Sequence, residues 1–278
     1  AGVFLGGDIT EWMSWTWIFL INVPLGLLVL ALVPAVLNKS PRSSGGIDWF
    51  GAISVTSALV SLVYAIVSIE AAGSDPSQTL SILVASGILF AIFVIAQFAR
   101  REPLLPLGIF KAPNLAAGNL VMALLGAAWI PLWFFLNLYL QQILGLSALA
   151  SGLALLPMTV TIMIVMVGFS GKLIARFGAK SNLVLGLLLM GGALWMFAQL
   201  PLDGTFVFDV LPASLLAAFG MALAYIPTTM TGMAGARPEE TGLASGLINT
   251  TYQIGSAIGL AVMVMLSTEP ARPPKRCW

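Results

Sequence analysis

Long apolar segments alternate with short polar ones along most of the chain. The clearest of them runs from Trp15 to Leu37 and carries no charge. It is close to the length of about 20 residues that a helix needs to cross a bilayer. Trp15 and Trp17 stand at its start, and tryptophan rings favour the headgroup level of a membrane. This segment therefore predicts a membrane-spanning helix that begins near one surface of the bilayer.

Seven further segments show the same pattern, so the sequence predicts about eight transmembrane helices and an all-α polytopic fold. They are residues 49–69, 80–99, 115–140, 153–169, 183–200, 210–231 and 243–266. Residues 100–114 are too rich in proline and too poor in continuous apolar residues to cross a bilayer. We expect them to form a cytoplasmic connector between two bundles of helices.

The positive charges support this count of spans. Every second polar segment is basic, and the cations of these segments are Lys39, Arg42, Arg100, Arg101, Lys111, Lys172, Arg176, Lys180 and Arg237. Lysine and arginine are concentrated in cytoplasmic loops of membrane proteins. We therefore expect residues 38–48 and 172–181 on the cytoplasmic side, and residues 71–79 and 201–208 outside. No charged residue falls inside a predicted span, so we expect no buried carboxylate that could relay protons.

Composition agrees with a membrane protein and restricts the chemistry. The chain is 59% hydrophobic and 8% charged, with a mean hydropathy of +1.00, which is more apolar than a water-soluble domain. The net charge of +1 indicates no nucleic-acid partner. Histidine is absent and Cys277 is the only cysteine, which excludes Cys–His and Ser–His catalysis and a histidine metal site within the chain. We expect no metal, no cofactor and no enzymatic activity.

Four motifs carry a resemblance to a known family. They are W-x-W-I-F-x-I-N-x-P-x-G from Trp15 to Gly26, YLQQILGLS from Tyr139, SGLALLP ending at Pro157, and GLASGLIN ending at Asn249. Together they resemble the fourteen-helix drug:proton antiporters of the major facilitator superfamily, the EmrB/QacA-type group. The resemblance covers the chain up to Glu269 and implies a partial major facilitator fold in the bacterial inner (plasma) membrane.

This resemblance also implies an organisation and a set of partners. The chain is similar to helices six to thirteen of the family, so we expect a truncated fragment that lacks most of the first half and the last helix. The expected parts are 1–14, the end of a truncated helix and an outer loop; 15–99, the last helix of the N-domain and two linking helices; 100–114, the connector; 115–267, five of the six C-domain helices; and 268–278, an atypical tail. The implied partners are a hydrophobic small molecule, protons, the lipid bilayer and the missing helices.

Two spans carry polar and aromatic side chains at helical spacing. The members of these two stripes are Trp129, Trp133, Asn137 and Gln141 on the fourth span, and Asn249 and Gln253 on the eighth. An amide that faces lipid leaves its hydrogen-bond donors unsatisfied. We therefore expect both stripes to face protein or water. One interpretation is a substrate path; the other is hydrogen bonding and close packing between helices.

Residues 171–180, GKLIARFGAK, resemble the short cytoplasmic gating loop that recurs in each half of this superfamily. The residues concerned are Gly171, Lys172, Arg176, Gly178 and Lys180. Glycine permits a tight turn, and an arginine can neutralise the C-terminal carbonyls of a helix. An anchor on the cytoplasmic side, with no role in gating, is an equally good interpretation.

The remaining candidates are structural. Pro131, Pro157 and Pro227 are expected to bend their spans. Gly255 and Gly259 are expected to mark a contact between helices. Asn22, with Pro24 two residues later, is expected to hydrogen-bond backbone groups near the outer end of the first span.

Three classes of function are compared on this basis. The resemblance favours part of a secondary multidrug transporter that exports hydrophobic compounds by proton antiport. A non-transporting scaffold or truncated product is the alternative. A membrane enzyme is the weakest, because histidine and intramembrane acids are missing and the one cysteine lies in the tail.

Overall fold

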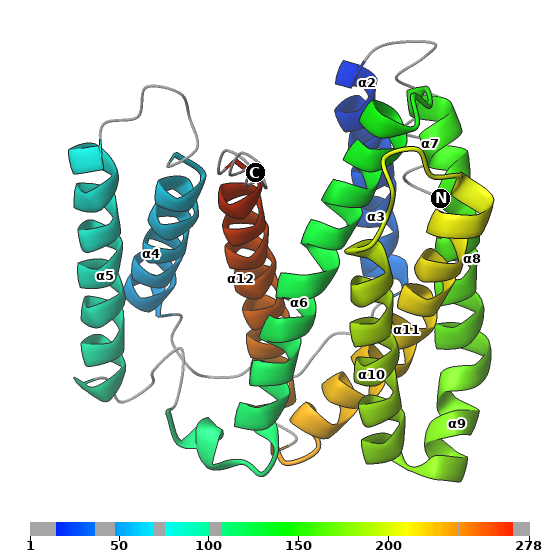
Figure 1. Cartoon of the computed structure of the whole chain (residues 1–278). Coiled ribbons are helices and arrows are strands. Elements are labelled where there is room, and N and C mark those ends of the chain that lie inside the picture. Colours follow the sequence, from blue (N-terminus) through cyan, green and yellow to red (C-terminus); the bar gives the residue numbers. More distant parts are fainter. Residues whose placement is uncertain (1–14, 37–47, 69–75, 100–106, 238–239, 269–278) are drawn as a thin grey trace, which may run out of the picture. The chain divides into compact units, whose positions relative to one another are not determined.

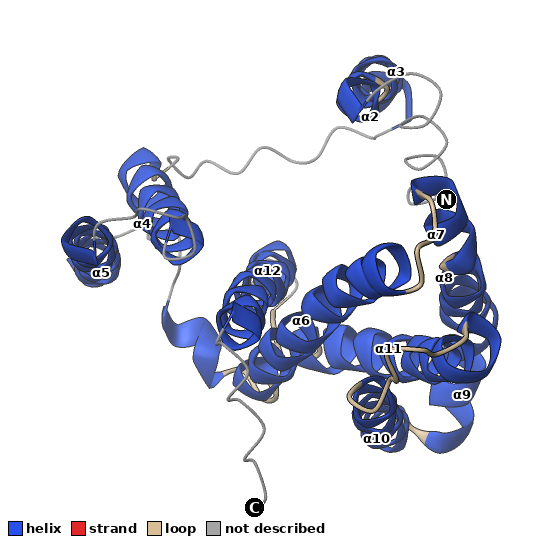
Figure 2. Cartoon of the chain, turned by 45° about the horizontal axis from the view of Figure 1, so that its top comes forward, coloured by secondary structure: helices blue, strands red, loops and turns tan. Residues whose placement is uncertain are grey.

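The computed structural model describes residues 15–36, 48–68, 76–99, 107–237 and 240–268, and every regular element within them is helical (Figures 1 and 2). The α-helices are α2 (Trp15–Leu20), α3 (Asn22–Val36), α4 (Trp49–Ser68), α5 (Pro76–Ala99), α6 (Leu115–Leu138), α7 (Ala148–Ala154), α8 (Leu156–Met163), α9 (Ser170–Phe177), α10 (Ala179–Phe197), α11 (Leu211–Met233) and α12 (Thr241–Thr268). A 3-10 turn, η1 (Leu107–Lys111), and three π-helical segments, η2 (Tyr139–Ile143), η3 (Ile164–Phe169) and η4 (Phe206–Val210), complete the order.

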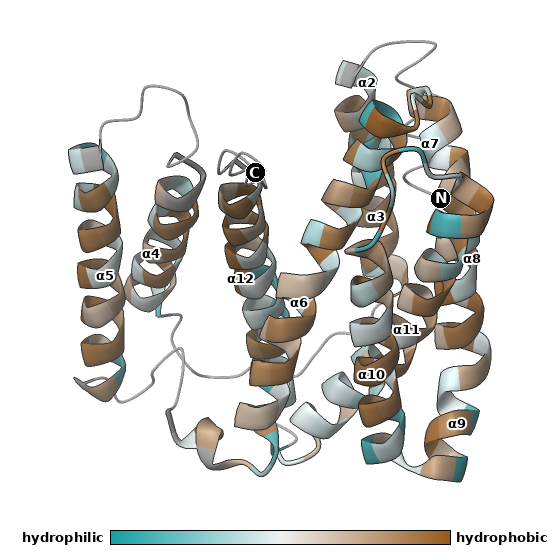
Figure 3. Cartoon of the chain, viewed as in Figure 1, coloured by the Kyte–Doolittle hydropathy of each residue, from teal (hydrophilic) through white to brown (hydrophobic). Residues whose placement is uncertain are grey.

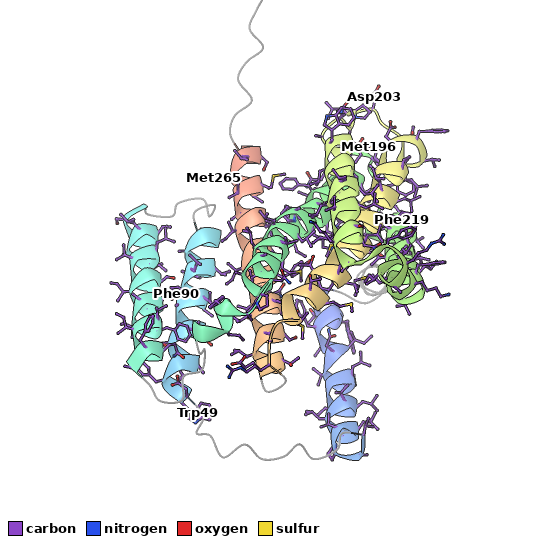
Figure 4. All side chains as sticks on the ribbon, turned by 90° about the horizontal axis from the view of Figure 1, so that it is seen from below. Trp49, Phe90, Met196, Asp203, Phe219 and Met265 are labelled. Atoms are coloured by element: carbon purple, nitrogen blue, oxygen red, sulfur yellow. The ribbon has the colours of Figure 1, made fainter. Side chains whose placement is uncertain are left out.

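Six of the described helical runs are long and apolar enough to cross a membrane, which confirms the polytopic all-α fold. The remaining two predicted spans correspond to the shorter apolar helices Asn22–Val36 and Trp49–Ala65. Hydrophobic residues dominate the helix bodies, and polar ones gather at ends such as those of α9 and α10 (Figure 3). Large apolar side chains, among them Trp49, Phe90 and Phe219, are exposed on the helix surfaces (Figure 4). This is the surface that a bilayer would cover.

Two predicted boundaries are wrong. Residues 171–180 are not a loop, because α9 and α10 include all of them except Gly178. Leu173 of α9 packs against the apolar cluster of Val165, Ala222 and Leu223, so this part of the chain gains burial by remaining helical.

Asp209 was expected outside a span but lies in η4, in the first turn of the helical run Phe206–Met233. A carboxylate is favoured at a helix N-terminus.

The chain divides into two compact units, one of residues 1–44 and 132–227, and the other of residues 45–131 and 228–278. Two of the boundaries fall directly after Pro131 in α6 and Pro227 in α11. Each proline ends the pattern Ala-aromatic-Ile-Pro, at residues 128–131 and 224–227. Both helices continue through their proline, whose side chain is buried. The domain division expected from the resemblance stays a prediction.

The core of the first unit depends on glycines in α10 and α11. A Cβ atom on Gly186 would lie 2.6 Å from the Ala224 backbone nitrogen, and one on Gly220 would lie 2.6 Å from the Met190 backbone nitrogen. These distances are shorter than any real Cβ contact, so the two helix backbones touch where both side chains are missing. Close approach of this kind is typical of helix packing in membranes.

In the second unit, α4 and α5 lie side by side as a helical hairpin (Figures 1 and 2). Buried residues recur every seven positions, at Gly51, Ala58 and Ala65 on α4 and at Thr79, Ser86 and Phe93 on α5. A seven-residue repeat is the spacing with which two helices keep one seam in contact. The Ser86 hydroxyl donates to the Ala58 carbonyl across this seam, over 2.8 Å.

One end of the hairpin is closed by a buried carboxylate. Asp48 is 5% exposed and accepts hydrogen bonds from the Gly51 backbone N–H over 2.8 Å and from Gln97 Nε2 over 3.2 Å. The first bond caps the N-terminus of α4, and the second joins α4 to the end of α5. Sequence reasoning had assigned no role to Asp48 or Gln97.

Helix α12 packs against the first part of α6 within the second unit. A Cβ on Gly255 would lie 2.7 Å from the Cα of Ala123, and one on Gly259 would collide with the Ala127 backbone. The Thr251 hydroxyl also donates to Asn119 Oδ1 over 2.7 Å, while Asn119 Nδ2 donates to the Leu115 carbonyl. Small residues and one hydrogen bond therefore hold this helix pair together.

Several predictions fall on residues outside the described part of the chain. These are the truncated helix at 1–14, the tail at 269–278, and the polar segments with Lys39, Arg42, Arg100 and Arg101.

Candidate functional site

The predicted stripe on α6 changes from buried to exposed along the helix. Trp129 is 8% exposed and Trp133 is half-buried, whereas Asn137 and Gln141 are exposed. Gln141 Nε2 donates to Asn137 Oδ1 over 2.9 Å, so the two amides form a pair on successive turns. The accessible part of the stripe is therefore the half-buried ring of Trp133 and the open amide pair, which lie in the first compact unit and suit an amphipathic ligand.

The predicted stripe on α12 lies on the face that does not pack against α6. Asn249 and Gln253 are exposed, while Ile248, Gly255 and Gly259 are buried. Asn249 Nδ2 donates to the Ser245 carbonyl of its own helix over 2.9 Å. Its hydrogen bond is therefore not interhelical, and an exposed amide within a membrane-length helix needs water or another protein segment beside it.

The interhelical hydrogen bond on this helix comes from residues that the sequence analysis did not select. Asn119 and Thr251 form it, 132 positions apart. The only sequence signal was the presence of polar side chains within apolar spans, and that signal does not identify the partners. Asn137 and Gln141 belong to the first compact unit, whereas Asn249 and Gln253 belong to the second.

The turn between α9 and α10 consists of one residue, Gly178, with φ +80°. This left-handed conformation favours glycine because a Cβ would clash with the backbone. Gly171, by contrast, lies within α9 with no atom close to its absent side chain. Lys172, Arg176 and Lys180 are all exposed.

A buried amide holds the two sides of this turn together. Asn182 is 4% exposed, and its Nδ2 donates to the Leu173 carbonyl over 3.0 Å and to the Gly178 carbonyl over 2.7 Å. The first of these bonds reaches back to α9 and the second to the turn residue, so the Asn182 side chain connects α10 to both. Sequence reasoning missed this residue, because an asparagine near a helix start is usually taken as a cap of its own helix.

The prolines and the Asn-x-Pro pair have different surroundings. Pro157 stands at the start of α8, directly after the break at Leu155 that separates α7 from α8. A proline is tolerated in the first turn of a helix, where its missing N–H costs nothing. Asn22 begins α3, and both Asn22 and Pro24 are exposed.

A third polar site, which the sequence analysis also missed, joins the end of α6 to the segment between α10 and α11. The Tyr139 hydroxyl donates to the Pro201 carbonyl over 2.6 Å. A Cβ on Gly204 would lie 2.7 Å from that hydroxyl oxygen, so the glycine leaves room for it. Asp209 Oδ2 accepts from the Thr205 backbone N–H over 2.6 Å and from its hydroxyl over 3.1 Å, which fixes the end of the same segment.

Tyr139→Phe should loosen this connection without disturbing α6. We expect a loss of about 1 kcal/mol, because one hydrogen bond is removed, and a melting temperature lower by roughly 2–4 °C. Thermal unfolding of the purified chain in detergent measures it. Tyr64→Phe, at a tyrosine that is 59% exposed on α4, is the matched control. An equal shift in both variants would contradict the role of the Tyr139 hydroxyl.

Among the described residues, no three His, Cys, Asp or Glu side chains are grouped so that they could hold a metal ion. Most of the polar groups that the described structure brings together are amides, hydroxyls and backbone carbonyls, and two carboxylates, Asp48 and Asp209, accept hydrogen bonds at helix N-termini.

Comparison with known proteins identifies the family that the chain matches. The model of the Major Facilitator Superfamily matches residues 1–260. The chain is 35% identical over 268 residues to the tetracenomycin C resistance and export protein of Streptomyces glaucescens, covering 96% of this chain and 49% of that protein. It is 33% identical over 273 residues to the cephamycin export protein CmcT of Amycolatopsis lactamdurans, covering 96% and 56%.

A third relative is the multidrug resistance protein B homolog of Mycobacterium tuberculosis, which is 28% identical over 272 residues, covering 96% of this chain and 50% of that protein. The chain thus spans about half the length of the relatives that it matches.

Proposed function

Because the chain belongs to the major facilitator superfamily, we propose that it forms part of a drug-efflux transporter that exports hydrophobic small molecules. The observation that carries this proposal is the match of 96% of the chain to proteins named for antibiotic export or resistance. The family and these names point to a transporter rather than to an enzyme. Six membrane-length helices and bacterial relatives make it a multi-pass protein of the bacterial inner membrane.

The finer part of the proposal is proton antiport by a transporter of the fourteen-helix EmrB/QacA-type group. The motifs from Trp15 to Gly26 and around Gly242 to Asn249 support it by resemblance. The name of the Mycobacterium relative, a multidrug resistance protein B homolog, agrees with that group.

We propose that the stripes on α6 and α12 line the substrate path. The half-buried ring of Trp133 on α6 would stack against an apolar drug, and Asn137 with Gln141 of η2 would hydrogen-bond its polar groups. Trp129 belongs to the same proposed stripe, but its ring is buried. On α12, the exposed amides of Asn249 and Gln253 support the same role, because they do not contribute to the packing face of that helix.

We also propose that the α9–α10 turn faces the cytoplasm. Helix α10 has 19 residues and is therefore about 28 Å long, which is close to the hydrocarbon thickness of a bilayer. Lys180 lies at its beginning, Lys172 and Arg176 lie just before it on α9, and Asp203 and Asp209 follow its end. By the preference of cations for the cytoplasmic side, the turn is inside and Asp203 is outside.

Drug uptake into sealed vesicles tests the function. A transporter extended to the full length of the relatives should accumulate ethidium when a proton gradient is imposed. The chain by itself should move none above empty vesicles, because alternating access requires two bundles that rock about a midplane site. Failure of the extended protein to respond to the gradient, with ethidium bound but not moved, would contradict proton antiport.

Asn249→Ala and Gln253→Ala in that extended protein test the substrate path. Each removes one amide, worth about 1 kcal/mol to a ligand that uses it, so we expect relative uptake of different drugs to change by about fivefold. Ser267→Ala, on the same helix but bonded to its own Val264 carbonyl, is the control. An equal loss for all drugs that follows a loss of protein from the membrane would support a packing role instead.

A further inference from the structure

We propose that the exposed basic face of the α9–α10 turn, formed by Lys172, Arg176, Phe177 and Lys180, binds the headgroups of anionic phospholipids. The proposal concerns the membrane around the chain and does not depend on the transported substrate. It rests on the exposure of these cations, on the absence of an ion pair to them within the described residues, on the hydrogen bonds that hold the turn and on the exposed ring beside them.

The three cations are presented to the surroundings. Lys172 and Arg176 are four residues apart on α9 and so share one face of it, and Lys180 follows four residues later in the first turn of α10. All three side chains are exposed. Within the described residues none of them forms an ion pair, and the sequence holds no acidic residue between Glu102 and Asp203. Among the described residues, the positive charge of this face is therefore not neutralised by an ion pair.

The turn that carries the cations is held in one conformation. Asn182 joins the Leu173 and Gly178 carbonyls through one buried side chain, and the Gly178 N–H donates to the Ile174 carbonyl over 2.8 Å. Leu173 packs into the apolar cluster of Val165, Ala222 and Leu223. A rigid set of cations loses less conformational entropy on binding than a flexible one.

The exposed ring indicates a lipid rather than a soluble anion as the ligand. Phe177 is 56% exposed, and the Arg176 guanidinium lies 5.3 Å from the centre of its ring. The face stands at the ends of two membrane-length helices, Ala148–Phe177 and Ala179–Phe197. An apolar ring beside cations at the end of a membrane-length helix suits the boundary between acyl chains and anionic headgroups.

Titration of the purified 278-residue chain in detergent with dioleoylphosphatidylglycerol tests the proposal, with retained lipid counted by native mass spectrometry. Each Lys or Arg near an anionic surface contributes about a fivefold gain in affinity. The triple variant K172Q/R176Q/K180Q should therefore bind phosphatidylglycerol at least tenfold more weakly. Its retention of dioleoylphosphatidylcholine should not change. Arg237→Gln, at an exposed cation outside this face, should weaken binding by no more than about fivefold, the contribution of one cation near an anionic surface.

The charge-conserving variant K172R/R176K/K180R separates charge from folding, and it should retain phosphatidylglycerol within about twofold of the parent. Equal retention by the parent and the triple glutamine variant would overturn the proposal and leave the face to another partner, such as an acidic protein segment. Equal loss of both lipids in that variant would also overturn it. Full displacement of the lipid by millimolar glycerol phosphate would assign the face to a soluble phosphate instead.

Discussion

Gly186→Leu should destabilise the first compact unit more than any other single change considered for it. The new Cβ would lie 2.6 Å from the Ala224 nitrogen and 2.8 Å from the Gly220 oxygen, so α10 and α11 must separate. Overpacking costs typically 1–3 kcal/mol and more against a backbone that cannot move. We expect about 3 kcal/mol, which lowers the melting temperature of a chain of this size by roughly 6–12 °C.

The control for this change lies one and a half turns along the same helix. Gly191→Leu also adds a leucine to α10, but no atom lies within 4 Å of its Cβ position and the residue is exposed. Both variants change helix propensity in the same direction, so the difference between them reports contact with α11. The melting temperatures of the two variants are measured in detergent. A difference below 2 °C, which corresponds to roughly 1 kcal/mol, would show that α10 and α11 do not touch at Gly186.

Gly255→Leu should have a comparable effect on the second unit. Its Cβ would lie 2.7 Å from both the Cα and the carbonyl carbon of Ala123, and the nearest atom is the Ala123 oxygen. The leucine would push α12 away from α6 and break the bond between Thr251 and Asn119. We expect a loss of about 3 kcal/mol or more, measured as the fall in melting temperature and in the monodisperse fraction after gel filtration.

Gly246→Leu is the matched variant on α12, because no atom lies within 4 Å of its Cβ position. This site lies on the stripe of Asn249 and Gln253, for which we propose contact with substrate. Gly246→Leu should therefore leave stability near that of the parent while changing drug uptake in a full-length transporter. If it destabilised the chain as much as Gly255→Leu, the two faces of α12 would not differ as described.

The helices themselves could be predicted from the sequence with small errors. The predicted spans 115–140 and 210–231 correspond to the helical runs Leu115–Ile143 and Phe206–Met233. A span is determined by the sum of its own residues, since about 20 apolar residues without charge must leave water. The errors occurred at the ends, as in α9, where Leu173 gains burial from α11 and keeps the chain helical.

The candidate site was predicted only in part. Helical spacing placed Trp129, Trp133 and Asn137 of α6 and Gln141 of η2 on one stripe, and the contact between the last two follows from a separation of four residues. It marked Gly255 and Gly259 as a contact between helices, and both lie against α6. It could not name α6 as the partner, because small residues show only that some helix comes close. Asn182 and Tyr139 were missed, since each acts on carbonyls of a different segment.

By itself, the sequence determined the class of protein, the number and approximate ends of the apolar helices, and the positions of the charges. These properties depend on hydrophobicity and charge summed along a local stretch of chain, which needs no knowledge of distant residues. The tertiary structure alone decided the partners: Asn119 with Thr251, Tyr139 with Pro201, Gly186 with Ala224, and Asn182 with Leu173. A buried polar side chain requires a hydrogen-bond partner, and some glycines in an apolar helix allow another helix to approach closely while others, such as Gly191 and Gly246, face open space. The sequence around such a residue does not specify which neighbour it will meet.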